Sequence, residues 1–557
     1  MIAIVVFPER RQLGRRTNRW WLLIALAAGI LFCGTLPRMA MAQATPVPSG
    51  PFRIAGTVVN AKAGNALTHC RVTIISARNR QSMQSLITGE DGRFEFHVPA
   101  GKYSLEGAKR GFVTASYNQH EQFSTAIVTG ADVDTENLIL RLPPNAVLSG
   151  RVLDEFSEPV RNAQVTVYRE ERQLGLSRTS VYRSATTDDQ GQYEVTSLPE
   201  GTYFISAKAS PWYAVHPALN ADGSTNQNIQ VDSSLDVAYS ITYYGDASDP
   251  DDATPIPVRA GDRLEADIHL NPVPAVHLLV HVPQGGNFPV FLKPGFDGAE
   301  QVEAHDVQSI SSGVYELSGL PAGRYTVRMP DGNGHNTEAS DLNLSSSGDL
   351  DASSAKSASQ LKVAVQIAGG GSLPAGLQLL LRDSRGKLNR ARVDAKGEAD
   401  FGDVMAGTYD ILAQAATERF SVVRVASDTA TISGHTMSVP PGTSLTIALS
   451  LVGGSVAVEG LAERDGKPAP GAMMVLLPKN SEADDDRVRC DESDLDGSFT
   501  FRNVIPGSYT VVAIEGWDLE WGKPAALGPY LKRGQPLEVG NRTTPIKLPD
   551  AVEVQTK

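Results

Sequence analysis

The feature of this chain that most limits its possible folds is a phrase of eight residues that occurs five times along 557 residues. It consists of an aliphatic residue, then Pro, Met or Ile, then x-Gly-x-Tyr, and a second aliphatic residue two positions after the tyrosine. The copies are VPAGKYSL at Val98–Leu105, LPEGTYFI at Leu198–Ile205, LPAGRYTV at Leu320–Val327, VMAGTYDI at Val404–Ile411 and VIPGSYTV at Val504–Val511. Each copy follows a turn signal and a short run with the alternation of a half-buried strand, as in Phe94/Phe96 and Phe499/Phe501. The glycine turns the chain and the tyrosine opens a second alternating run, so each copy predicts two strands joined by a corner.

The five tyrosines of this phrase are predicted to be structural. A tyrosine at a strand corner can bury its ring and donate its hydroxyl to nearby backbone, as in the tyrosine corner of immunoglobulin-like sandwiches. We expect this arrangement, and no catalytic use, for Tyr103, Tyr203, Tyr325, Tyr409 and Tyr509.

The length of the chain exceeds what one hydrophobic core supports, and four to five domains is the expectation. The repeats predict an all-β protein, a tandem array of about five immunoglobulin-like or transthyretin-like β-sandwiches behind an N-terminal signal peptide. The third and fourth sandwiches are the most degenerate copies. The expected ranges are 1–42 for the signal peptide, 50–142, 146–271, 274–346, 358–450 and 454–550 for the sandwiches, and 347–357 for a flexible linker.

The N-terminal segment has the order of a secretory signal. A basic stretch at Arg10–Arg19 precedes an apolar run at Trp20–Leu36 and the small-residue cleavage signal Ala40-Met41-Ala42. The alternative is an uncleaved signal anchor, because the apolar run is nearly long enough to span a membrane. Either interpretation predicts an exported protein of the periplasm, the outer envelope or the extracellular space.

The charge of the chain limits its partners. The formal net charge is −13, and removal of residues 1–42, with six basic residues and one acidic residue, leaves −18. An acidic chain without basic stripes argues against nucleic acid and against anionic membrane surfaces, so a membrane contact is expected only through an uncleaved anchor. Outside the signal only Cys70 and Cys490 remain, in the first and last predicted sandwiches, which favours stabilisation by cores rather than by disulfides.

Further strands complete a recognisable pattern. Gly-x-Val, Val-Thr-Val or Val-Thr-Ile, Asp-x-Gly-x-Tyr/Phe and Pro-x-Gly-x-Tyr follow one another, most clearly from Ile54–Ser76 and Leu148–Arg169 onward. This order resembles the carboxypeptidase regulatory-like domain, and Ile241–Leu270 is similar to an ending in secreted acidobacterial members of that family. The resemblance implies a small seven-stranded sandwich similar to transthyretin and to bacterial surface modules. It implies no reaction, because in metallocarboxypeptidases this domain accompanies a separate catalytic zinc domain.

The acidic loop Ser481–Phe499 contains the best metal candidate of the sequence. Glu492, Asp494 and Asp496 alternate and Gly497 follows, and hard oxygen ligands at this spacing suit calcium. The alternative is that the loop is a solvated turn of the sandwich. No other cofactor is expected.

Aromatic residues near polar groups in predicted loops are the remaining hint of binding. The candidates are Trp212, Tyr213, Trp517, Trp521 and Tyr530. Exposed aromatic rings can stack on sugar rings or anchor a protein partner, whereas the same residues could also cap the ends of the sandwich cores.

These observations predict an exported, non-catalytic binding or scaffolding protein of the cell envelope or surface, whose partner is an envelope protein or a polysaccharide. One alternative is a carbohydrate-binding accessory protein that uses its aromatic loops. A second alternative is a peptidase-related enzyme with a site between domains. We expect no enzyme, because the one motif of the zinc-peptidase type, His335-Asn336-Thr337-Glu338, lies in a Gly/Asn-rich loop.

Overall fold

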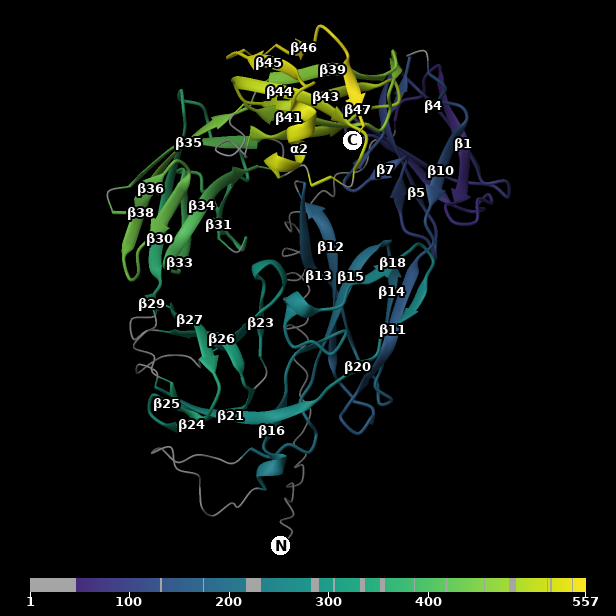
Figure 1. The fold of residues 1–557 in the computed structure, drawn as a ribbon. Coiled ribbons are helices and arrows are strands. Elements are labelled where there is room, and N and C mark those ends of the chain that lie inside the picture. The colour runs from purple at the N-terminus through teal and green to yellow at the C-terminus, as the bar shows by residue number, and fades with distance from the viewer. Residues whose placement is uncertain are drawn as a thin grey trace, which may run out of the picture. The chain divides into compact units, whose positions relative to one another are not determined.

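A computed structural model describes residues 47–556 except 131–132, 174, 217–231, 282–289, 304–305, 331–335, 351–355, 385, 416–418, 428, 455, 480–486, 518, 521–522 and 543. The predicted signal peptide, residues 1–42, and His335 lie outside the described residues. Within them almost all regular structure is β-strand, and the one α-helix is α2 (Pro524–Leu531) (Figure 1). The predicted all-β class is therefore confirmed.

The first sandwich has two sheets and a small hairpin. Its sheets have the orders β10-β1-β4 and β3-β2-β5-β6, with β9 also paired to β5, and β7 pairs β8. The strands are β1 (Phe52–Asn60), β2 (Arg71–Ser76), β3 (Met83–Ile87), β4 (Arg93–Val98), β5 (Gly101–Ala108), β6 (Ala115–Ser116), β7 (Gln119–His120), β8 (Phe123–Ser124), β9 (Ile127–Thr129) and β10 (Leu138–Leu142).

The second sandwich repeats this plan. Its sheets run β14-β11-β19, with β20 also on β11, and β13-β12-β15-β17, with β18 also on β15. The strands are β11 (Ala146–Leu153), β12 (Gln164–Gln173), β13 (Leu176–Thr186), β14 (Gln192–Leu198), β15 (Gly201–Lys208), β17 (Thr242–Tyr243), β18 (Ile256–Val258), β19 (Arg263–Glu265) and β20 (Ile268–His269).

The third sandwich includes a strand from an unexpected part of the chain. Its sheets run β16-β21-β25-β24, with β28 also on β21, and β23-β22-β26-β27-β29. β16 lies within 146–271, yet it pairs antiparallel with β21. The strands are β16 (Val237–Tyr239), β21 (Pro272–His281), β22 (Val290–Pro294), β23 (Glu300–Val302), β24 (Asp306–Ser311), β25 (Val314–Pro321), β26 (Gly323–Pro330), β27 (Asn336–Leu344), β28 (Gly348–Leu350) and β29 (Lys356–Ser357).

The fourth and fifth sandwiches each form one continuous set of nine strands. The fourth consists of β30 (Ser359–Ile367), β31 (Gln378–Asp383), β32 (Leu388–Arg392), β33 (Glu398–Val404), β34 (Gly407–Gln414), β35 (Arg419–Ser427), β36 (Thr431–Ser433), β37 (Thr436–Val439) and β38 (Ser444–Gly453). The fifth consists of β39 (Val456–Arg464), β40 (Lys467–Pro468), β41 (Met473–Pro478), β42 (Arg489–Glu492), β43 (Ser498–Val504), β44 (Gly507–Ile514), β45 (Gln535–Val539), β46 (Ile546–Lys547) and β47 (Val552–Gln555).

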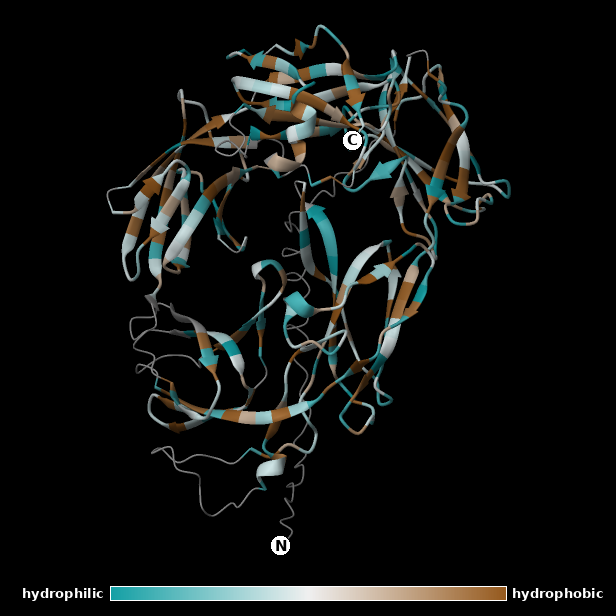
Figure 2. Cartoon of the chain, in the orientation of Figure 1, coloured by the Kyte–Doolittle hydropathy of each residue, from teal (hydrophilic) through white to brown (hydrophobic). Residues whose placement is uncertain are grey.

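The cores arise from the alternation of the strands. Side chains along β4 and β30 alternate between buried and accessible, and Figure 2 shows hydrophobic and hydrophilic residues alternating along many strands. The inward-facing residues form five main cores, with members in the ranges 47–142, 146–270, 276–350, 361–451 and 456–554.

The corner tyrosines all adopt the predicted arrangement. Each ring is buried and each hydroxyl donates to the carbonyl oxygen four residues earlier. The pairs are Tyr103 to Pro99 (3.1 Å), Tyr203 to Pro199 (2.8 Å), Tyr325 to Pro321 (2.6 Å), Tyr409 to Met405 (2.9 Å) and Tyr509 to Ile505 (2.7 Å). One local hydrogen bond thus fixes the same corner in all five sandwiches.

The turn before β43 shows why glycine is needed there. Gly497 has a φ of +79°, and a Cβ at this position would lie 2.7 Å from the carbonyl oxygen of Ala462. Asp494 closes the turn, since its N–H donates to the Ser498 carbonyl at 2.8 Å and its carbonyl accepts from Gly497 N–H at 2.8 Å. Asp188 and Asp394 close the matching turns of the second and fourth sandwiches.

We expect Gly497→Ala to lower the free energy of unfolding of the fifth sandwich by about 2–3 kcal/mol. The reason is that the cost of a positive φ at alanine and the cost of the clash with the Ala462 carbonyl add together. Gly466→Ala is the matched control. Gly466 has a φ of +71° but no atom within 4 Å of its added Cβ, so only the strain of about 1 kcal/mol applies. Urea unfolding of both variants measures the difference, and equal losses would show that the clash relaxes.

Candidate functional site

The acidic loop of the fifth sandwich contacts the first sandwich. Glu492, at the end of β42, has a buried side chain. Its Oε1 accepts a hydrogen bond from Thr125 Oγ1 at 2.5 Å and lies 3.3 Å from His120 Nδ1. A buried carboxylate needs such partners to offset its lost hydration, so these contacts hold the loop against the first sandwich.

Asp494 makes a second contact across the same boundary. Its Oδ2 pairs with Lys102 Nζ from β5, which also donates to Ser498 Oγ at 3.0 Å. Burial raises the pKa of the Asp494 carboxyl, and the Lys102 ammonium opposes part of that rise. The next residue, Leu495, donates its N–H to the Ala126 carbonyl at 2.9 Å and packs against the first core.

These residues form one interface, which we call the 1–5 junction. It comprises Lys102, His120, Thr125 and Ala126 of the first sandwich and Glu492, Asp494 and Leu495 of the fifth. The junction combines the Lys102–Asp494 ion pair, the His120–Glu492 contact, two hydrogen bonds and an apolar contact.

The predicted calcium ligands have different environments. Glu492 and Asp494 are engaged in the 1–5 junction, and Asp496 Oδ1 accepts the Ser498 N–H at 3.0 Å within the turn. Within the described part of the chain, the one group of three or more His, Cys, Asp or Glu residues whose ligand atoms lie within 4.8 Å of one another is His216, Asp236 and His277, outside this loop. Calcium binding by this loop stays a prediction.

Asp491 adds an unusual titration to this loop. Burial, together with the nearby Asp494 carboxylate, raises the pKa of its carboxyl to about 7, and the hydrogen bond from Thr500 N–H and the Lys102 ammonium oppose part of the rise. The Asp491 Oδ2 accepts the Thr500 N–H at 2.7 Å. The fifth sandwich therefore holds a carboxyl that ionises near neutral pH.

Trp517 lies beside the 1–5 junction. Its ring stacks on His120 with centroids 5.0 Å apart and planes 3° apart, and it packs on Phe123 at 5.5 Å. Its Nε1 donates to the Gly471 carbonyl at 3.0 Å, and its own carbonyl accepts from Arg172 of β12. The structure thus uses Trp517, predicted as a ligand platform, in contacts with residues of the first two sandwiches.

Residues 524–531 form helix α2, whereas the sequence indicated a loop there. Helix α2 begins at Pro524, and Tyr530 on it is buried in a small core with Val512 and Leu527. Tyr530 therefore caps a core, which is the alternative weighed for these aromatics. Trp521 lies outside the described residues.

Trp212 and Tyr213 have contrasting environments. The Trp212 side chain is exposed, with 83 % of its surface accessible, and its ring meets Tyr213 edge-on at 5.8 Å. Tyr213 donates its hydroxyl to the Glu155 carboxylate, which also accepts from Tyr239 at 2.8 Å. Burial, together with the hydrogen bond to Glu155, raises the pKa of the Tyr213 phenol to about 12, so Tyr213 is a neutral donor that supports an accessible indole.

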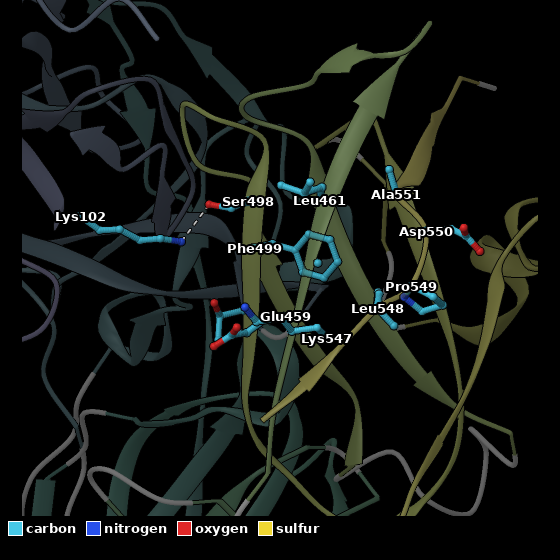
Figure 3. A pocket seen from close by; sticks show the side chains of 12 residues that line it. Lys102, Glu459, Leu461, Ser498, Phe499, Lys547, Leu548, Pro549, Asp550 and Ala551 are labelled. Atoms are coloured by element: carbon cyan, nitrogen blue, oxygen red, sulfur yellow. Dashed lines mark hydrogen bonds between the residues drawn. The ribbon is translucent and has the colours of Figure 1, made fainter. Parts of the chain in front are cut away.

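A hollow of about 450 Å³ lies over the sheet formed by β39, β43 and β46 (Figure 3). Lys102 reaches its edge and donates to Ser498, and the Phe499 ring lies at its floor (Figure 3). Its lining mixes both charges, from Lys102, Glu459, Lys547 and Asp550. Such a surface offers polar contacts but no accessible aromatic platform, because Phe499 is buried.

Sequence reasoning did not identify Lys102, His120 or Thr125 as partners of the acidic loop. Lys102 lies 392 residues before its partner Asp494 in the chain. His120 and Thr125 lie 372 and 367 residues before their shared partner Glu492. No local periodicity or motif connects residues at such separations.

Comparison with protein families agrees with the architecture of the first two sandwiches. The carboxypeptidase regulatory-like domain matches residues 53–138 and 147–232. The chain therefore contains two carboxypeptidase regulatory-like domains, and the predicted resemblance is confirmed.

Solved structures of bacterial proteins, two of them pilins, align with parts of the chain at low similarity. The Bacillus anthracis TIE protein aligns at 12% identity over 72% of this chain and 75% of its own, with a TM-score of 0.17. The minor pilin GBS52 of Streptococcus agalactiae aligns at 11% identity over 40% and 97%, with a TM-score of 0.22. The shaft pilin SpaA from Lactobacillus rhamnosus GG aligns at 10% identity over 41% and 98%, with a TM-score of 0.19. Scores this low carry no functional argument.

None of the curated proteins matches the sequence. Among the residues that the structure describes, no helix has both the length and the apolar character needed to cross a membrane.

Proposed function

We propose that this chain is an exported, non-catalytic binding or scaffolding protein of the cell envelope or surface, built from carboxypeptidase regulatory-like repeats. The observation that carries the proposal is the 1–5 junction. Glu492 and Asp494 of the acidic loop contact the first sandwich, and so does the neighbouring Trp517. Chemistry-bearing side chains that join modules favour a scaffold over a catalyst.

A second candidate function is carbohydrate binding, and the exposed ring of Trp212 favours it. An indole with an accessible face can stack on the apolar face of a sugar ring. The Tyr213 ring contacts the indole edge-on and its hydroxyl donates to Glu155, and both contacts limit the motion of Trp212. Trp212 is therefore a better candidate than Trp517 for a polysaccharide contact.

The test is binding of the purified mature chain to a panel of polysaccharides and envelope fractions. If Trp212 forms a sugar site, Trp212→Ala weakens polysaccharide binding at least tenfold, whereas Trp212→Phe retains most of it, because each stacked ring contributes about 1–3 kcal/mol. Trp517→Ala serves as the comparison, with binding unchanged. Isothermal titration or affinity electrophoresis measures the affinities.

The outcomes separate the two functions. Saturable binding to envelope proteins without binding to any polysaccharide supports the scaffold. Polysaccharide binding that is lost in Trp212→Ala supports the accessory protein instead. An absence of binding to every envelope fraction and polysaccharide would contradict both.

A further inference from the structure

Three metal-ligating side chains meet at the boundary between the second and third sandwiches. His216 Nδ1 lies 2.9 Å from Asp236 Oδ1, and His277 Nε2 lies 2.9 Å and 2.8 Å from the two oxygens of the same carboxylate. One ligand atom from each residue falls within 4.8 Å of the others. The two imidazoles meet edge to face with centroids 6.0 Å apart, and each directs one nitrogen at the Asp236 carboxylate.

The fold brings these residues together from three segments. His216 follows β15 in the chain, and Asp236 directly precedes β16. Val215 N–H donates to the Leu235 carbonyl at 2.9 Å, and Ala275 N–H donates to the Asp236 carbonyl at 3.0 Å. The unexpected pairing of β16 with β21 therefore places Asp236 beside His277.

A β-bulge in β25 lies opposite His277. The register of β21 on β25 shifts between Val276 and Leu278, where Ser318 and Gly319 of β25 oppose the single residue His277, and the His277 N–H donates to Ser347 Oγ at 2.9 Å. Bulges often occur next to functional sites. Gly319 in this bulge has a φ of +77°, and a Cβ there would lie 2.7 Å from His216 Nε2. The backbone thus leaves room for the second imidazole.

A second carboxylate lies behind His277. Glu316 Oε1 is 3.7 Å from His277 Nδ1, and both side chains are buried, with 2 % and 4 % of their surfaces exposed. The His277 Nδ1 makes no hydrogen bond to any residue that the structure describes. Metal-ligating histidines commonly direct their second nitrogen at a carboxylate, which orients the ring and raises its basicity.

We propose that His216, Asp236 and His277 bind a divalent transition metal of the Zn²⁺ class, with Glu316 as the outer carboxylate of His277. Two imidazole nitrogens and a carboxylate oxygen are a common donor set for this ion. Metal–ligand bonds of about 2.0–2.2 Å place tetrahedral ligand atoms about 3.3 Å apart, so the present spacing must widen by about 0.5 Å.

Such a metal would act as a clasp between the two sandwiches. It would link His216 and Asp236, both in the chain before residue 271, to His277 on β21 of the third sandwich. Three protein ligands leave a fourth position for water or for a group from a partner.

The test uses the mature chain stripped of metal with a chelator and titrated with ZnCl₂ and, separately, with CoCl₂. We expect one equivalent of Zn²⁺ to bind and to raise the melting temperature, since an ion that binds only the folded state stabilises it. Bound Co²⁺ should give the visible absorption bands of a four-coordinate site with nitrogen and oxygen ligands. His216→Asn and Asp236→Asn should each weaken Zn²⁺ binding at least 100-fold, and Glu316→Gln about 10- to 100-fold.

His281→Asn is the matched control, because His281 lies on the same strand with an exposed side chain and should leave binding unchanged. His216 and Asp236 are only partly buried, so their variants are expected to fold, and circular dichroism checks this. Binding that survives in both variants, or no stoichiometric binding by the folded wild-type chain, would overturn the proposal. The latter result would leave these residues as a hydrogen-bonded His–Asp–His network.

Discussion

Asp491→Asn is expected to raise the free energy of unfolding of the fifth sandwich by about 2–4 kcal/mol at pH 8. Burial raises the pKa of the Asp491 carboxyl to about 7 in the folded chain, against about 3.9 for an unfolded aspartate. Each unit of difference corresponds to about 1.4 kcal/mol, and partial access of solvent reduces the sum. The asparagine carries no charge and its amide oxygen can still accept the Thr500 N–H, so it retains the contact without the cost of ionisation.

The sign of the pH dependence follows from the raised pKa. Below about pH 4 both states of the wild type are protonated at Asp491, and the two proteins are expected to differ little. Between about pH 4 and pH 7 the unfolded carboxyl is ionised while the folded one still holds its proton, so the wild type loses stability relative to the variant as pH rises. Above about pH 7 both states are ionised and the difference is constant.

Tryptophan fluorescence gives a specific measurement of this effect. Residues 43–557 contain Trp212, Trp517 and Trp521, so urea unfolding of this part of the chain in a Trp212→Phe background reports on the fifth sandwich. Asp550→Asn is the control, since it removes the same charge from an exposed position. Parallel pH profiles for wild type and Asp491→Asn would show that Asp491 does not titrate in this range.

Tyr203→Ala is expected to destabilise the second sandwich by about 3–5 kcal/mol, the loss typical of a large buried ring. Tyr203 is fully buried, and its ring meets Tyr182 edge-on at 5.8 Å. Tyr203→Phe should cost only about 1 kcal/mol, because it keeps the ring and removes one hydrogen bond to the Pro199 carbonyl. The two variants therefore separate the packing of the ring from the bond that fixes the corner.

Hydrogen–deuterium exchange of peptides from β12 and β15 measures this loss within the intact chain. Peptides from β31 and β34 of the fourth sandwich serve as an internal control, and their exchange should not change. Equal effects of the alanine and phenylalanine variants would contradict the assignment of most of the stability to the ring.

The all-β class and the strand corners could be predicted because their causes are local. A glycine, a tyrosine and a period of two lie within eight residues, and the hydrogen bond that results spans four. The same local logic predicted burial of the corner tyrosines, including Tyr409 in a degenerate copy. The family resemblance is confirmed over the first two sandwiches for the same reason.

The environment of the candidate site could not be predicted in this way. Whether Glu492 faces water or Thr125 depends on which module the loop meets, and local sequence contains no such information. Trp517 and Trp212 occur in similar loops, yet one is stacked on His120 and the other is exposed. Asp236 and His277 are brought together only because β16 pairs with a strand of the following module.

That pairing also has a consequence for how this array could have been assembled in evolution. β16 lies in the chain between β15 and β17 of the second sandwich, whereas its hydrogen bonds are made to Pro272–Pro274 at the start of the third. A gene duplication or deletion with its breakpoint near residue 272 would leave one copy with an unpaired strand and the other with an open sheet edge, which invites aggregation. The second and third modules are therefore expected to be inherited, lost or exchanged only as a single block.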